Sequence, residues 1–145
     1  MILQKYDELN KWMKDYPNIG SWLYFNVTDL EVDNNSLNSV SGARYLEDNI
    51  DGSKECELLF AVDMIKSYDT GTADTNLEAL QECESLMNWV EEQMENENLP
   101  QFKKCNVHEV EILDSTPSLS VDTDQQLAKY QIQGRVRYLE LKGEQ

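Results

Sequence analysis

The sequence predicts an α+β domain with two layers, in which two helices pack on one face of an antiparallel sheet in the order α-β-β-β-α-β-β. Residues 125–141 and 54–68 each alternate between apolar and polar side chains, which gives a strand one apolar and one polar face. Residues 1–16 and 75–94 each carry a single apolar stripe at helical spacing. Two striped helices and a one-sided sheet bury their apolar surfaces against each other.

The length of 145 residues predicts one domain, 1–145, with a core of its own. The content of 40% hydrophobic residues indicates a folded chain. No apolar run approaches the roughly 20 residues of a membrane span. The start, MILQKYDELNK, lacks the features of a signal peptide, so we expect a cytosolic chain without membrane partners.

The charge balance argues against a nucleic-acid-binding protein. The chain has 28 acidic and 12 basic residues, a net charge of −16, whereas phosphate contact needs clustered Lys and Arg. The three cysteines, Cys56, Cys83 and Cys105, are widely spaced without a C-x-x-C motif. We therefore expect free thiols rather than a disulfide or a metal site.

The first helix, residues 1–16, is expected to end before Pro17. Residues 22–27 predict a strand with both faces apolar, and residues 40–47 predict a weak one. Between them, residues 28–39 are polar and acidic and predict a mobile loop. Its acids Asp29, Glu31 and Asp33 are candidate subunit-interface residues.

Asp51-Gly52 predicts a hairpin turn before the strand 54–68. One parity of that strand is apolar and faces the core. The other parity mixes charged residues with Leu59, Ala61 and Ile65. An outer face with apolar residues among its charges indicates that something covers it, and these three residues are the second group of candidate interface residues.

The second helix is predicted to open with a capping box, Thr75-x-x-Glu78. Its C-terminal end is crowded with carboxylates that oppose the helix dipole: Glu91, Glu92, Glu95 and Glu97. Two interpretations remain open for this end, a solvated acidic surface or an acidic contact for a partner.

Residues 106–113 predict the next strand, followed by a polar connection to the last one. If these two strands pair, one register sets Glu111 opposite Arg135 and Glu109 opposite Arg137. The two arginines then belong to the scaffold. His108 shares the parity of the apolar residues, so we expect it to be partly buried and structural.

No pattern in the chain indicates catalysis, and we expect neither an enzyme nor a cofactor. A single histidine leaves a zinc site short of ligands. The run from Asp29 to Asn35 resembles the start of an EF-hand loop but lacks its glycine and its closing glutamate. Phosphate-binding glycine loops and nucleophile elbows are missing from the sequence, so we expect no metal, cofactor-binding or catalytic residues.

Four pieces of the chain, in order, resemble a small family of minor capsid proteins from long-tailed bacteriophages that is related to tail terminators. These pieces are Ile50–Lys54, Phe60-Ala61 with Tyr68, Trp89–Gln93 leading to Asn98-Leu99-Pro100, and Ala128–Gln133 with Arg135 and Tyr138. The resemblance runs from about Ile50 to Tyr138, and the first fifty residues add little to it.

The resemblance implies a tail-terminator-like fold and a virion protein at the head–tail junction. It implies a homo-oligomeric ring, usually of six subunits, that caps the tail tube and meets the head connector, so the partners would be the chain itself, the tail tube protein and the connector proteins. Composition alone leaves a second interpretation, a small acidic cytosolic adaptor without catalysis.

Overall fold

Two long antiparallel strands, β4 (Lys54–Ser67) and β7 (Leu127–Glu140), form the middle of the sheet and pair along their whole length. The computed structural model describes residues 2–17, 23–26, 34–41, 45–71 and 73–141. The alternation in both strands gives each one an apolar face. Pairing in this register brings the two apolar faces to the same side of the sheet, where the helices cover them.

Shorter strands flank the central pair on both sides. β2 (Asn35–Ser39) and β3 (Tyr45–Asp48) pair antiparallel with β4, and β5 (Cys105–Ile112) and β6 (Ser118–Asp122) pair antiparallel with β7. β1 (Tyr24–Phe25) pairs parallel with β2. The result is an antiparallel sheet of six strands, extended at one edge by the parallel β1.

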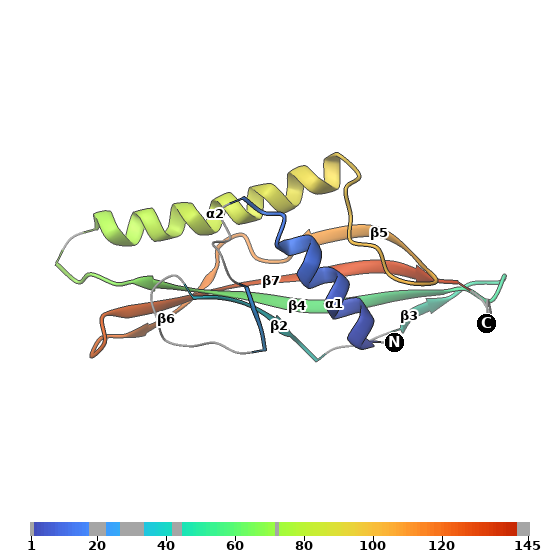
Figure 1. Ribbon diagram of the computed structural model, residues 1–145, viewed down its shortest axis with the longest axis horizontal. Coiled ribbons are helices and arrows are strands. Elements are labelled where there is room, and N and C mark those ends of the chain that lie inside the picture. Colours follow the sequence, from blue (N-terminus) through green and yellow to red (C-terminus); the bar gives the residue numbers. More distant parts are fainter. Residues whose placement is uncertain (1, 18–22, 27–33, 42–44, 72, 142–145) are drawn as a thin grey trace.

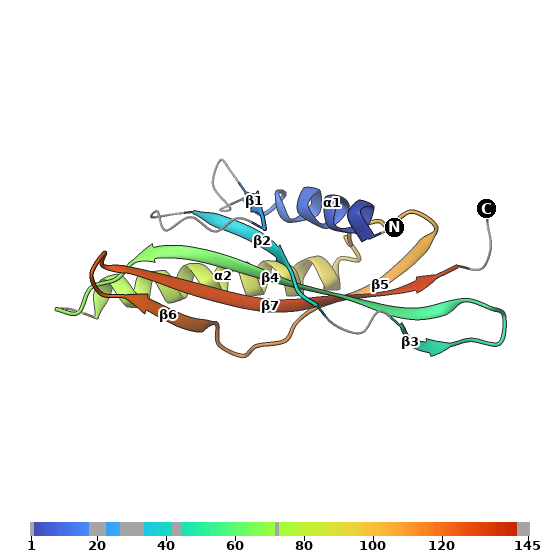
Figure 2. The same ribbon diagram turned by 90° about the horizontal axis from the view of Figure 1, so that it is seen from below.

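The two helices are α1 (Ile2–Met13) and α2 (Asp74–Glu95). α2 runs along the sheet and lies above it in Figure 1, with α1 inclined in front. In Figure 2, seen from below, β4 and β7 lie in front of α2, while α1 lies beside β1 and β2. α2 therefore covers one face of the central strands, and its contacts are with β5, β4 and β7.

The predicted core-facing parity of the central strands is buried. Side chains of both helices join it in one hydrophobic core. Its sheet residues include Cys56, Leu58, Phe60, Val62, Met64, Tyr130, Ile132 and Val136. The exposure of each of these is 5% or less, so the parity assigned to both long strands is confirmed.

The predicted order of elements was incomplete. The observed order is α-β-β-β-β-α-β-β-β. Residues 35–39 and 118–122, expected in polar connections, form β2 and β6. Both are short segments rich in small polar residues. They form strands because their backbones hydrogen-bond to the long strands beside them, β4 and β7.

Several boundaries also differ from expectation. α1 ends at Met13 rather than Tyr16, with a turn up to Pro17. Of the strand expected at 22–27, the described part is strand only at Tyr24–Phe25. The weak strand expected at 40–47 is found at Tyr45–Asp48. The hairpin turn before β4 is confirmed, with Gly52 at a φ of 91°, a conformation that favours glycine.

The predicted capping box of α2 is not formed. Ala73 occupies the position before the first helical residue and makes no side-chain cap. Instead, the amide of Asn76 donates to the Asp69 carbonyl (2.8 Å) and accepts from the Asp69 backbone N–H (3.1 Å). These two bonds tie the first turn of α2 to the start of the loop that follows β4.

Candidate interaction surfaces

On the sheet face opposite α2, arginines from β7 alternate with glutamates from both neighbouring strands. Arg135 lies 3.6 Å from Glu57 and 3.1 Å from Glu111. Arg137 lies 3.7 Å from Glu57 and 3.9 Å from Glu109. The predicted register of Glu111 with Arg135 and Glu109 with Arg137 is confirmed. The charges of this row are thus paired within the sheet.

A buried carboxylate lies further along the same face. Asp63 on β4 is 4% exposed. It accepts hydrogen bonds from the Asn38 amide (2.8 Å) and the Gln131 amide (2.9 Å), which come from the two strands beside β4. A buried carboxylate is costly unless hydrogen-bonded, so this network joins β2, β4 and β7 and is structural.

The candidate interface residues on β4 do not form an exposed patch. Ala61 and Ile65 are 2% and 0% exposed, and Leu59 is half-buried. The Leu59 carbonyl accepts a hydrogen bond of 2.5 Å from the Tyr6 hydroxyl of α1. The chain itself therefore buries Ala61 and Ile65, and only Leu59 of the three is partly accessible. The other candidates, Asp29, Glu31 and Asp33, lie outside the described residues.

His108 lies on the opposite face from the one expected. The register between β5 and β7 shifts between Val107 and Glu109, so His108 is the extra residue of a β-bulge. The bulge turns its ring to the outer face, where it is exposed and pairs with Glu55.

Besides β1 and β5, which end the strand order, the short strands β3 and β6 present outer edges. β3 pairs only with β4 and β6 only with β7, so in the described part of the chain their outer edges have no strand neighbour. Figure 2 shows β6 and β3 at opposite ends. β6 also exposes Leu119 and Val121, which share the face of their buried partners Tyr130 and Ala128. An open edge with apolar side chains is suited to pairing with another chain.

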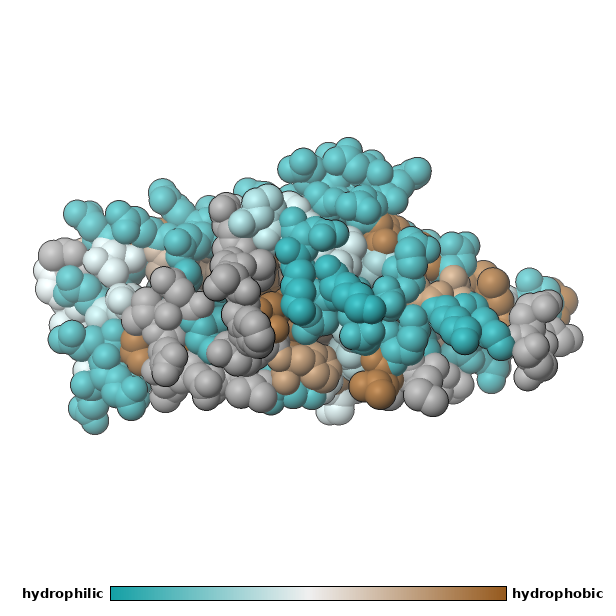
Figure 3. Space-filling model, in the orientation of Figure 1, coloured by the Kyte–Doolittle hydropathy of each residue, from teal (hydrophilic) through white to brown (hydrophobic). Residues whose placement is uncertain are grey.

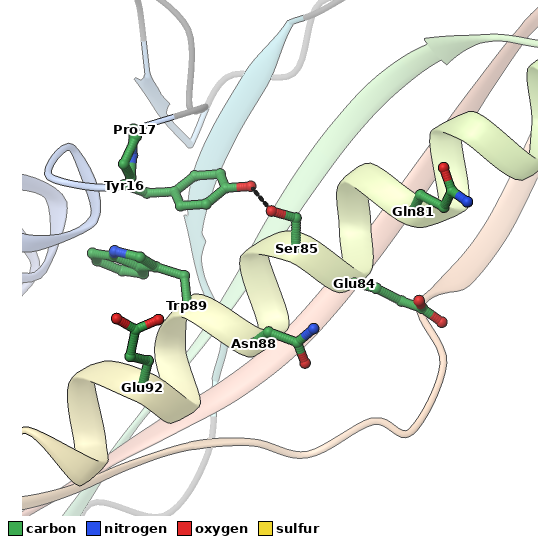
Figure 4. Close-up of a pocket in the computed structure, with 8 residues that line it drawn as sticks. All are labelled: Tyr16, Pro17, Gln81, Glu84, Ser85, Asn88, Trp89 and Glu92. Carbon is green, nitrogen blue, oxygen red and sulfur yellow. Dashed lines mark hydrogen bonds between the residues drawn. The ribbon is translucent and has the colours of Figure 1, made fainter.

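A groove of about 450 Å³ runs between the end of α1 and the outer side of α2. Figure 4 shows the Trp89 indole beside Tyr16, with Glu92 and Asn88 extending from the same helix. The full lining is Tyr16, Pro17, Gln81, Glu84, Ser85, Asn88, Trp89 and Glu92. It combines aromatic surface, amide groups and carboxylates.

Packing holds the aromatic wall of the groove in place. Trp89 packs against Trp12 (ring centroids 4.9 Å apart) and Tyr16 (5.5 Å). The Tyr16 hydroxyl hydrogen-bonds the Ser85 hydroxyl at 2.8 Å, and the Trp12 indole donates to the Asn98 carbonyl at 2.9 Å. The wall is therefore fixed before any ligand arrives. Its two main residues, Tyr16 and Trp89, are far apart in sequence, and no local pattern predicted their meeting.

The surface of α2 around the groove is acidic. The helix contains seven Asp and Glu residues and no Lys or Arg. Its partner Lys66, on β4, pairs with Glu82 at 2.5 Å. Among the described residues neither Glu84 nor Glu92, the two carboxylates of the groove, has a basic partner. On the face shown in Figure 3, hydrophilic residues predominate and apolar residues form only small separate patches.

The buried thiol and phenols of the core resist ionisation. Burial raises the pKa of Cys83 to about 12, and burial likewise raises the pKa of Tyr6 and of Tyr130. A thiol must ionise to act as a nucleophile or metal ligand. These groups therefore stay protonated and serve packing.

Among the described residues, no three His, Cys, Asp or Glu side chains lie together in a group that could hold a metal ion. Nor does any helix within the described ranges have the length and apolar character needed to cross a membrane.

No protein-family model matches the sequence. No curated protein matches it significantly either.

Proposed function

We propose that this chain is a structural subunit of a bacteriophage virion, forming a ring at the head–tail junction between the tail tube and the head connector. The observation that carries the proposal is the order of the four resembling pieces. They fall on the β3–β4 turn, on β4, on α2 with the segment after it, and on β7. The resemblance thus follows the central strands and the helix over them. A tail-terminator-like fold, with both helices in one layer, is part of the proposal.

The outer edges of β3 and β6 support a ring. A closed ring of identical subunits needs two different surfaces on each subunit, because each contact is head to tail. β3 and β6 lie on opposite sides of the central pair and at opposite ends. An edge-to-edge contact between β6 of one copy and β3 of the next uses both.

The acidity of the chain agrees with a place around a DNA passage. A net charge of −16 repels phosphate and keeps DNA from binding as it moves through a channel.

The second candidate is a small acidic adaptor that binds a partner without assembling. The groove between α1 and α2 favours it, because a fixed aromatic wall flanked by carboxylates is suited to binding. An adaptor needs this groove but no ring.

Native mass spectrometry separates the two candidates. The ring predicts one closed oligomer, and negative-stain images of the protein mixed with purified tail tubes should show density capping one end of each tube. A protein that stays monomeric at every concentration and leaves the tube ends bare is not a ring subunit.

A further inference from the structure

The groove between Tyr16 and α2 has the chemistry of a binding site for a basic peptide segment. Trp89 and Tyr16 offer aromatic surface, and Glu84 and Glu92 lie on the same lining. A guanidinium or ammonium group is attracted both to an aromatic face and to a carboxylate. Neither carboxylate has a basic partner among the described residues.

The charge of the chain selects the kind of occupant. A second copy brings another net charge of −16, and like charges oppose its approach to an acidic helix. A basic segment is instead steered toward that helix by the same field. We propose that the groove docks an extended segment of a different protein that carries two arginine or lysine residues.

The helix fixes the spacing of those two residues. Glu84 and Glu92 are eight positions apart on α2, which is about 12 Å along the helix axis. An extended chain rises about 3.3 Å per residue and turns alternate side chains to one face. Two basic residues four positions apart therefore span about 13 Å on one face.

Fluorescence anisotropy with labelled synthetic peptides tests this inference, and it does so whether or not the chain forms a ring. The probe is a serine peptide with two arginines four positions apart. One comparison peptide has the same composition with the arginines adjacent, and another replaces both arginines with citrulline, which is neutral and similar in shape. We expect the spaced peptide to bind most tightly, the citrulline peptide not to bind, and salt to weaken binding.

Matched variants locate the binding surface. Glu84→Gln with Glu92→Gln removes two charges from the groove, and Glu78→Gln with Glu95→Gln removes two from exposed positions of the same helix outside it. We expect the groove pair to weaken binding of the spaced peptide by at least about tenfold, and the control pair to change it by less than about threefold. Trp89→Phe tests the aromatic wall and should weaken binding while leaving the fold intact by circular dichroism.

Three results would overturn the proposal. Equal weakening by the two pairs of variants would mean a diffuse charge effect. Equal binding of the spaced and adjacent peptides would mean that the groove does not select the spacing of the two basic residues. If no peptide binds but the chain self-associates, and the groove pair abolishes this, the occupant is a second copy rather than a basic partner.

Discussion

The Phe60 ring of β4 lies over Gly134 of β7, its cross-strand partner. A Cβ atom built on Gly134 would lie 2.4 Å from Phe60 Cζ, far inside van der Waals contact. Glycine at this position therefore makes room for an aromatic ring in the centre of the core, and an aromatic ring covers the glycine in return.

A double-mutant cycle tests this relationship. Phe60→Ala should cost about 3–5 kcal/mol of unfolding free energy, and Gly134→Ala should cost about 1–3 kcal/mol because its methyl group meets the ring. In the Phe60→Ala background the clash is gone, so Gly134→Ala should cost much less. Urea denaturation of the four proteins measures the coupling. Strictly additive costs would mean that the two residues do not constrain each other.

The glutamates of the outer face should contribute unequally. Glu57 contacts both Arg135 and Arg137 and its side chain is 13% exposed, whereas Glu111 contacts Arg135 alone and is 43% exposed. Glu57→Gln should therefore cost about 1–3 kcal/mol, and Glu111→Gln less than about 1 kcal/mol. Thermal or urea denaturation gives both values. A larger loss from Glu111→Gln would contradict the central position of Glu57.

The sequence predicted the faces of the long strands and the register of β5 with β7, because charge and periodicity are local patterns. Alternation identified both faces of β4 and β7, and opposite charges gave the register of Glu109 and Glu111 with the arginines of β7. The sequence did not predict the bulge at His108, because one extra residue in a strand does not change the pattern of residue types. The side assigned to His108 was wrong for that reason.

What the sequence missed depends on contacts between distant segments. β2 and β6 consist largely of small polar residues and are strands only because β4 and β7 lie beside them. The groove forms where Tyr16, just after α1, meets Ser85 and Trp89 on α2. The apolar residues Ala61 and Ile65 looked like an open patch, because the strand pattern cannot show what the rest of the chain buries.

Alkaline pH should destabilise the fold through Cys83. Burial raises the pKa of its thiol to about 12, so above about pH 9 the unfolded chain loses a proton that the folded chain retains. Unfolding free energy should therefore fall as pH rises from about 9 toward 12. Cys83→Ala should flatten part of this slope, and Cys105→Ala, at a less buried thiol, is the control. An unchanged slope in Cys83→Ala would exclude this thiol as a cause.

The last prediction concerns the edge of β6. Val121 is 37% exposed on this strand, and Leu77 is 56% exposed on α2, away from either sheet edge. Val121→Lys places a charge on an open edge, a device by which natural proteins prevent strand pairing between molecules. It should abolish the ring in native mass spectra. Because the side chain is exposed, the melting temperature of the monomer should change little.

Leu77→Lys adds the same charge and removes a similar apolar side chain, so it is the matched control and should leave the ring intact. The proposed contact also requires β3, and Leu46→Lys, exposed on that strand, should abolish the ring as well. Mixing the two edge variants then distinguishes head-to-tail pairing from symmetric pairing. Each variant retains one intact edge, so a β6-to-β3 contact allows the mixture to form dimers but no closed ring. If the parent forms a ring and Val121→Lys still forms it, β6 is not a lateral contact.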